Sequence, residues 1–204
     1  MGDNIWTAFK DGISIYPEYF KVRLIVLQLQ NSPWCSSVML ENLHAVLREI
    51  RSNNPQSTII LSGTSMGGSI VINSLKKSEI TAHIHAVITS SSSTQLDKLL
   101  LATNSKKVKK ALIMSTGDSV APEKILKSQS LHYATPHIKL PIVIIYSPYD
   151  IILPSEHILE TASKLIEQGT PVKLIKMNRP KGHYRPTKKE LLNGFEWIRE
   201  IIHL

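Results

Sequence analysis

Residues 63–67 place a serine between two glycines, in the order Gly63-Thr64-Ser65-Met66-Gly67. An apolar run over 58–62 precedes them, and an apolar pattern with helical spacing follows. A serine at such a strand–turn–helix junction presents its Oγ at the top of a sheet, where it can act as a nucleophile. The partial positive charge and the free N–H groups at the start of the helix would then favour a developing oxyanion. A tight turn without chemistry is the alternative.

Gly63 and Gly67 are expected to be structural requirements of this turn. The serine between them would sit in strained backbone, where a side chain two residues away on either side would collide with the neighbouring strand or helix. We therefore predict that both positions need glycine.

A serine hydroxyl needs a base to become a nucleophile, and the base needs a third group to orient it. Asp150 follows the apolar run 142–146, and His183 lies in a loop after the β-branched run 172–176. Parallel strands bring such residues to one edge of a sheet, at their carboxyl ends. We expect Ser65, Asp150 and His183 to meet there.

Each member of this set has an alternative role. Asp150 could simply cap the next helix or brace its turn, and His183 could be a surface histidine, one of eight in the chain. Asp97 and Asp118 are rival acids, although neither follows a convincing strand.

Two other groups could suggest chemistry. His83 and His85 lie two residues apart, as metal ligands can, but no cysteine or carboxylate pattern accompanies them, so we expect no metal site. Cys35 is the single cysteine. We interpret it as a packed small side chain rather than a nucleophile.

The elements that must position these residues alternate between two periods. Apolar β-branched runs, typical of strands covered on both faces, occur at 22–28, 58–62, 85–89, 142–146 and 172–176. Helical stripes lie between them, and they predict an α/β fold: a mostly parallel central sheet with helices on both faces. We expect one domain over residues 1–204.

Two helix ends carry capping signals. Ser155 is a predicted N-cap, with Gly169 just past the end of the same helix. Thr187 and Glu190 form the pattern of a capping box at the start of the last helix. Residues 94–138 are helical in part and lysine-rich, and they are interrupted by Gly117, Pro122 and Pro136. We interpret 94–138 as a small lid-like excursion from the sheet.

Composition limits the function classes. The 204 residues are 42% hydrophobic and 20% charged, with a net charge of +8. The basic residues are dispersed, apart from Lys106, Lys107, Lys109 and Lys110, so we expect no nucleic-acid partner. Those four lysines could favour an anionic lipid surface or a negatively charged substrate. The apolar runs are short of the roughly 20 residues that span a bilayer. One cysteine and no visible signal peptide predict a cytoplasmic protein.

The motifs together resemble the α/β-hydrolase superfamily. Three segments carry the likeness: Gly63–Gly67, the Asp150-Ile-Ile-Leu-Pro154 turn, and Gly182-His183, in the family order of nucleophile, acid and histidine. The resemblance covers residues 20–204. It implies Ser65 as nucleophile, His183 as general base and then acid, and Asp150 as the group that orients the imidazole. It implies Met66 N–H as an oxyanion donor, and no cofactor.

The N-terminal residues depart from the family pattern. The family sheet begins with several more strands, and one of them ends in a loop that supplies a second oxyanion donor. Residues 1–6 resemble the tail of that loop, so the N–H of Asp3 or a neighbour would be the second donor. The alternatives are a chain shortened at its N-terminus and a rearranged, minimal sheet in which the strands at 22–28 and 58–62 pair directly.

The resemblance implies a serine hydrolase that cleaves small-molecule carboxylic esters or thioesters through an acyl-enzyme. The leucines of 94–138, among them Leu96, Leu99, Leu101 and Leu112, would line an acyl pocket. The alternative is a catalytically impaired, α/β-hydrolase-like binding protein that lacks the N-terminal strands and part of the oxyanion hole. A peptidase or acyltransferase using the same three residues is the third interpretation. Oligomeric state stays open.

Overall fold

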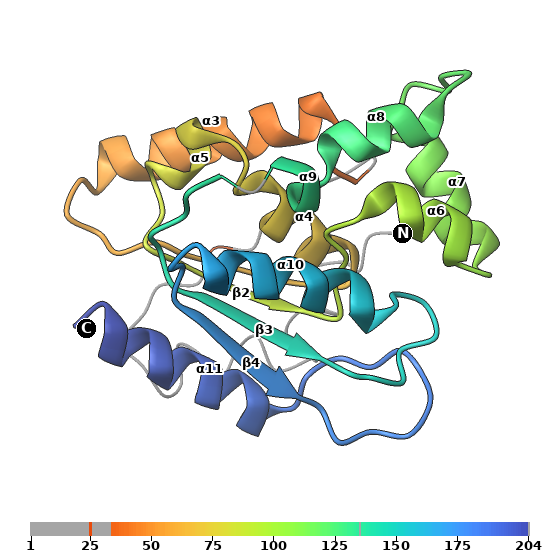
Figure 1. Cartoon of the computed structure of the whole chain (residues 1–204). Coiled ribbons are helices and arrows are strands. Elements are labelled where there is room, and N and C mark those ends of the chain that lie inside the picture. The colour runs from red at the N-terminus through yellow and green to blue at the C-terminus, as the bar shows by residue number, and fades with distance from the viewer. Residues whose placement is uncertain (1–24, 26–33, 135, 204) are drawn as a thin grey trace.

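A four-stranded parallel sheet forms the centre of the molecule (Figure 1). The computed structural model describes residues 25, 34–134 and 136–203. The strands follow one another in space as in sequence: β1 (Ile60–Thr64), β2 (Ala86–Ser90), β3 (Ile142–Tyr146) and β4 (Val172–Lys176). All three pairings are parallel, so the four carboxyl ends meet at one edge. The predicted α/β class is confirmed.

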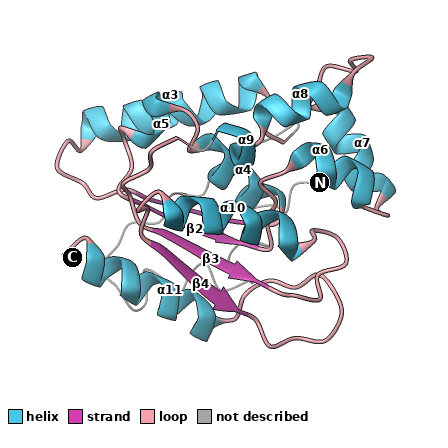
Figure 2. Cartoon of the chain, in the orientation of Figure 1, coloured by secondary structure: helices cyan, strands magenta, loops and turns pink. Residues whose placement is uncertain are grey.

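Helices cover both faces of this sheet, as Figure 2 shows. The described helices are α3 (Ser37–Asn53), α4 (Met66–Ser74), α5 (Ser78–Thr81), α6 (Leu96–Ala102), α7 (Lys106–Met114), α8 (Pro122–Gln129), α9 (Leu131–Ala134), α10 (Ser155–Glu167) and α11 (Lys188–Ile201). None of these helices is both long enough and apolar enough to span a bilayer. The strand predicted at 22–28 lies outside the described residues, except for Ile25.

Successive side chains of a strand point to opposite faces of the sheet, so the core has two halves, one on each face. Val87, Ile142 and Ile144 face α3, α4 and α10, whereas Val143 and Ile145 face α11 on the other side. Both faces of β2 and β3 are therefore covered, which explains why these strands are almost continuously apolar in sequence. This burial holds the loops at the carboxyl ends of the strands in fixed positions.

The segment between β2 and β3 folds into α6, α7, α8 and α9, and Figure 1 shows the first three grouped to one side of the sheet. Leu96, Leu99 and Leu112 have no exposed surface, because they pack against one another's helices and against Trp34 and Met39. Leu101 points outward and is 70% exposed. The expectation that these leucines line an acyl pocket is therefore wrong: three of them are buried in a core cluster that also includes Trp34 and Met39.

The helix ends match the capping signals in part. Thr187 Oγ1 accepts a hydrogen bond from Glu190 N at 3.3 Å, and Glu190 Oε2 accepts one from Thr187 N at 2.6 Å, so the capping box is confirmed. The predicted N-cap at Ser155 is wrong: Pro154 occupies that position, and Ser155 is the first helical residue. The extended backbone of Pro154, with φ −52° and ψ 126°, leads directly into α10.

Candidate active site

Ser65 lies at the junction of β1 and α4, on a sharp turn. Its backbone has φ 56° and ψ −121°, a conformation that residues with a side chain rarely adopt. The turn is held by two backbone hydrogen bonds, from Ser65 N to Ser90 O and from Ser69 N to Ser65 O, both 2.9 Å long. The strand–turn–helix geometry expected from residues 63–67 is thus present, with the strained residue at the serine.

The glycine requirement differs from the prediction at one position. A Cβ on Gly63 would lie 2.5 Å from the carbonyl carbon of Gly67, as expected for a close backbone approach. A Cβ on Gly67 itself would meet no described atom within 4 Å, so the predicted collision there is wrong. The second tight position is Gly68, whose Cβ would lie 2.8 Å from Thr89 Oγ1 and 2.9 Å from Ser90 O.

A chain of two hydrogen bonds joins the three residues that the sequence singled out. His183 Nε2 lies 2.9 Å from Ser65 Oγ, and His183 Nδ1 lies 2.8 Å from Asp150 Oδ2. The imidazole comes from the loop between β4 and α11, and the carboxylate comes from the loop after β3. Segments 118 and 33 residues apart in sequence therefore converge at the carboxyl edge of the sheet.

Asp150 has two roles in this geometry. Its side chain is 1% exposed, and Oδ1 accepts hydrogen bonds from Ile152 N and Leu153 N, both at 2.9 Å. Bracing of its own turn, the alternative considered for this residue, is therefore present together with the bond to His183. A buried carboxylate with three donors is fixed in orientation, and it in turn fixes the imidazole ring.

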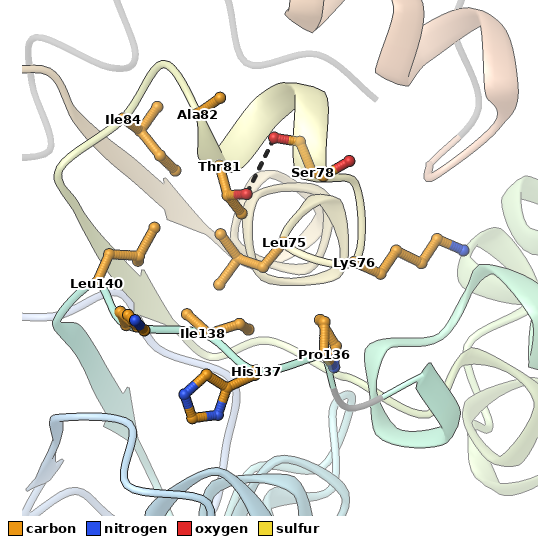
Figure 3. A pocket seen from close by; sticks show the side chains of 11 residues that line it. Leu75, Lys76, Ser78, Thr81, Ala82, Ile84, Pro136, His137, Ile138 and Leu140 are labelled. Atoms are coloured by element: carbon orange, nitrogen blue, oxygen red, sulfur yellow. Dashed lines mark hydrogen bonds between the residues drawn. The ribbon is translucent and has the colours of Figure 1, made fainter.

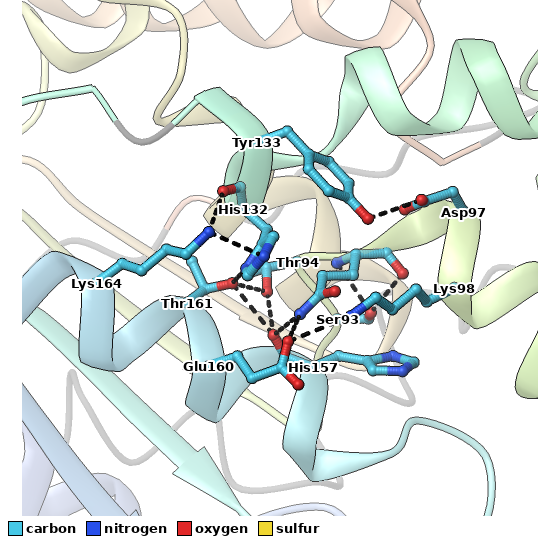
Figure 4. Close-up of polar contacts among 11 residues, drawn as sticks. Ser93, Thr94, Asp97, Lys98, His132, Tyr133, His157, Glu160, Thr161 and Lys164 are labelled. Atoms are coloured by element: carbon cyan, nitrogen blue, oxygen red, sulfur yellow. Dashed lines mark hydrogen bonds and ion pairs between the residues drawn. The ribbon is translucent and has the colours of Figure 1, made fainter.

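The rival acids lie elsewhere. Asp97 is in the first turn of α6, where its Oδ2 accepts a hydrogen bond from the Tyr133 hydroxyl at 2.8 Å (Figure 4). Asp118 is exposed, in the turn between α7 and α8. Asp150, by contrast, lies against His183.

The structure describes one of the two oxyanion donors expected from the sequence. Met66 is the first residue of α4, where an α-helix has no carbonyl of its own to accept the N–H. That N–H adjoins Ser65 and can donate to a negatively charged oxygen there. Asp3, the second predicted donor, lies outside the described residues.

Ser90, Ser91 and Ser93 form the part of the site that the sequence analysis missed. Thr64 and Ser90 exchange a hydroxyl–hydroxyl bond of 2.7 Å, and Ser93 N donates to Ser69 Oγ at 3.0 Å. Ser91 Oγ donates to Tyr184 O at 2.8 Å, beside His183. The position of these hydroxyls directly after a buried strand, at the carboxyl edge, was the signal that could have identified them.

This arrangement can activate a hydroxyl. A serine Oγ bonded to an imidazole can transfer its proton to Nε2 as it attacks an electrophile, and a carboxylate on Nδ1 stabilises the imidazolium that results. The three groups therefore have the positions that nucleophilic catalysis needs.

Comparison with known proteins places this geometry in a family. The serine aminopeptidase S33 family matches the chain over residues 36–137, which is half of its length and includes Ser65. The chain belongs to this family. The S33 family is part of the α/β-hydrolase superfamily, so the resemblance drawn from the sequence is confirmed. A search of curated protein sequences gave no match.

Solved structures share the fold with this S33 member at low identity. An acylaminoacyl peptidase from Pyrococcus horikoshii matches with a TM-score of 0.61 and 16% identity, over 80% of this chain and 27% of the peptidase. A puromycin-hydrolyzing peptidase from Mycobacterium tuberculosis matches with a TM-score of 0.64 and 13% identity, over 77% of this chain and 23% of the peptidase. The chain thus spans about a quarter of these proteins, and the likeness shows the fold.

A surface hollow is lined by residues that are close in sequence to Asp150 and His183. It has a volume of about 640 Å³ and is lined by Asn104, Ser105, Ile151, Ile152 and Lys181. Ile151 is next to Asp150 in the chain, and Lys181 is two residues from His183. The hollow is therefore lined by sequence neighbours of Asp150 and His183, whereas Ser65, Asp150 and His183 are not among its lining residues.

A second hollow lies away from these residues. It has a volume of about 410 Å³ and is formed between the end of α4 and the segment before β3 (Figure 3). Ile84 and Leu140, which line it, precede β2 and β3. This hollow is therefore at the amino end of the strands, opposite the edge that carries Ser65.

The other residues that the sequence analysis considered for chemistry lie in surroundings that do not suggest a reactive or metal-binding role. Cys35 is fully buried, and burial raises the pKa of its thiol to about 12, so it stays protonated near neutral pH. His85 Nδ1 accepts a hydrogen bond from Ile59 N at 3.0 Å. Among the described residues, no three histidine, cysteine or acidic side chains gather as metal ligands would. The four lysines of 106–110 are exposed on α7.

Proposed function

We propose that the chain is a serine hydrolase that cleaves small-molecule carboxylic esters or thioesters through an acyl-enzyme. The observation that carries the proposal is the pair of hydrogen bonds on His183, at 2.9 Å to Ser65 Oγ and 2.8 Å to Asp150 Oδ2. Membership of the S33 family supports hydrolysis by a serine nucleophile.

The proposed reaction has two steps. Ser65 Oγ attacks the carbonyl carbon while its proton passes to His183 Nε2, and the oxyanion that forms accepts a hydrogen bond from Met66 N–H. The tetrahedral intermediate then expels the alcohol or thiol, which takes the proton from Nε2. Water attacks the acyl-enzyme as His183 Nε2 takes its proton, and this proton passes to Ser65 Oγ as the carboxylic acid leaves.

Asp150 orients His183 throughout this cycle. Its bond to Nδ1 keeps the proton on that nitrogen, so Nε2 faces Ser65 with its lone pair free. When Nε2 takes the serine proton, the buried carboxylate stabilises the positive ring.

Peptide hydrolysis is the second candidate. It is supported by the description of the family as serine aminopeptidases and by the peptidase names of the solved structures with this fold. The same three residues would act, but His183 would have to protonate an amine as it leaves, which is a harder step than release of an alcohol or thiol.

The test compares an ester substrate with an aminopeptidase substrate. We expect a p-nitrophenyl butyrate rate well above that for an alanine p-nitroanilide, and no rate above background with Ser65→Ala. A higher kcat/KM for the anilide would favour the peptidase. If the folded wild-type protein hydrolyses neither, the binding-protein alternative gains support.

Three further expectations stay proposals. Segment 94–138 would act as a lid over the site, as part of a single domain. An anionic lipid surface would be the peripheral partner of the exposed lysines on α7. The protein would be cytoplasmic, on the evidence of its single, buried cysteine.

A further inference from the structure

Residues at the end of β2 are hydrogen-bonded both to the turn of Ser65 and to the loop of His183. Ser90 O accepts a hydrogen bond from Ser65 N at 2.9 Å, which anchors the nucleophile's turn. The next residue, Ser91, donates through Oγ to Tyr184 O at 2.8 Å, directly beside His183. The adjacent residues Ser90 and Ser91 therefore anchor the backbone of the nucleophile and the backbone next to the imidazole.

We infer that Ser91 is a positioning residue for the reaction proposed above: its hydroxyl sets the distance between His183 Nε2 and Ser65 Oγ. This inference rests on the proposed function for its effect on rate. The claim about the loop of His183 stands on the hydrogen bond itself.

The loop that carries His183 needs such anchors. It runs from Met177 to Thr187, without regular secondary structure. Gly182 N donates to Tyr149 O at 3.0 Å, which ties the residue before His183 to the loop of Asp150. The Ser91 bond ties the residue after His183 to β2. The imidazole is thus held from both sides, toward the acid and toward the nucleophile.

The backbone of Ser91 supports a role beyond packing. Its φ is +43°, in the left-handed region, and Ser91 N donates to Ile145 O at 3.0 Å. A non-glycine residue is strained in such a conformation, which persists where the surroundings require it. Ser91 is 3% exposed, so the hydroxyl is directed to the Tyr184 carbonyl rather than to water.

Two substitutions separate the hydroxyl from the backbone. Ser91→Ala removes the hydroxyl and keeps the backbone strain, whereas Ser91→Gly removes both. Ser92→Ala is the matched control: Ser92 is equally buried, but its hydroxyl accepts a bond from Thr89 Oγ1 and does not bear on the His183 loop.

The first readout is the second-order rate at which a fluorophosphonate labels Ser65. We expect Ser91→Ala and Ser91→Gly to slow it by about 10- to 100-fold, because a small misplacement of a catalytic group has a large effect on rate. Ser92→Ala should stay near the wild-type rate. With p-nitrophenyl butyrate, the loss should lie in kcat, with KM unchanged, since buried Ser91 does not meet the substrate. A wild-type rate in Ser91→Gly would overturn the inference.

The second readout does not depend on activity. Deuterium uptake over residues 178–186 should be faster in both Ser91 variants than in the wild type and in Ser92→Ala, because one anchor of the loop is lost. Unchanged uptake would overturn the inference. If the wild type is not labelled at all, the proposed function fails, and uptake alone then decides whether Ser91 holds the loop.

Discussion

Gly63 and Gly67 approach so closely that a Cβ on Gly63 would lie 2.5 Å from both the carbonyl carbon and the carbonyl oxygen of Gly67. The contact is one-sided, since a Cβ on Gly67 would meet no atom of the described residues within 4 Å. The β1 strand and the first turn of α4 thus meet backbone to backbone, and this contact forces the chain through the strained conformation of Ser65.

The one-sided contact predicts different outcomes for three alanine substitutions. Gly63→Ala and Gly68→Ala should each lower the free energy of unfolding by about 2 kcal/mol or more, because backbone atoms cannot move aside as a flexible side chain can. Gly67→Ala should be neutral or should stabilise by up to about 1 kcal/mol, as alanine favours the helix. Urea unfolding of the three variants measures this, and a Gly67→Ala loss equal to that of Gly63→Ala would contradict the geometry.

Asp150→Asn tests which acid serves His183. We expect the esterase rate to fall by about 10³- to 10⁴-fold, because the amide can no longer hold the imidazole in the required tautomer. The protein should stay folded, since the asparagine oxygen can still accept from Ile152 N and Leu153 N.

Asp97→Asn is the control for this substitution, because Asp97 pairs with Tyr133 on α9 rather than with His183. Its esterase rate should match the wild type. A large loss in Asp97→Asn together with a wild-type rate in Asp150→Asn would show that the acid is misassigned.

Stability should fall as the pH is lowered through about 6.5. Burial lowers the pKa of His157, and burial followed by the charge of Lys164 lowers that of His132, whose Nε2 lies 3.0 Å from Lys164 Nζ (Figure 4). Below the unfolded pKa, the unfolded chain binds protons that the native state does not, so the free energy of unfolding decreases. The charged groups Asp97, Lys98, Glu156 and Glu160 also face this pair.

Urea midpoints at about pH 7 and about pH 5 measure the effect. The difference between the two midpoints should shrink in His132→Gln, which keeps hydrogen-bonding atoms but does not titrate. It should stay unchanged in His137→Gln, which replaces an exposed histidine. An equal difference in the wild type and in His132→Gln would show that His132 is not linked to folding.

The sheet could be predicted closely where apolar patterning decides the element. β3 and β4 have the predicted bounds, because a run such as Ile142–Tyr146 must be buried. β1 and β2 begin and end later than the predicted 58–62 and 85–89. They end at Thr64 and Ser90, since pairing of these two residues depends on the neighbouring strand and not on their polarity. The helices of 94–138 were harder to predict from sequence, because their apolar stripes are short and pack mainly into one cluster of the core.

The site could be predicted where strand ends carried the signal. Ser65, Asp150 and His183 each follow a strand, and the parallel topology brings them together. The need for glycine at 68 rather than 67 could not be predicted from sequence, because it depends on the distance to Thr89 and Ser90 of the adjacent strand. Ser91 was missed for the same reason: its partner, Tyr184, lies 93 residues away in sequence.

Labelling with a fluorophosphonate probe, followed by mass spectrometry of the modified peptide, tests the central claim most directly. The account predicts that one serine of the folded wild-type protein is modified, that it is Ser65, and that Ser65→Ala abolishes the label without loss of fold. A folded wild-type protein that stays unlabelled, or a label that persists in Ser65→Ala, would contradict it.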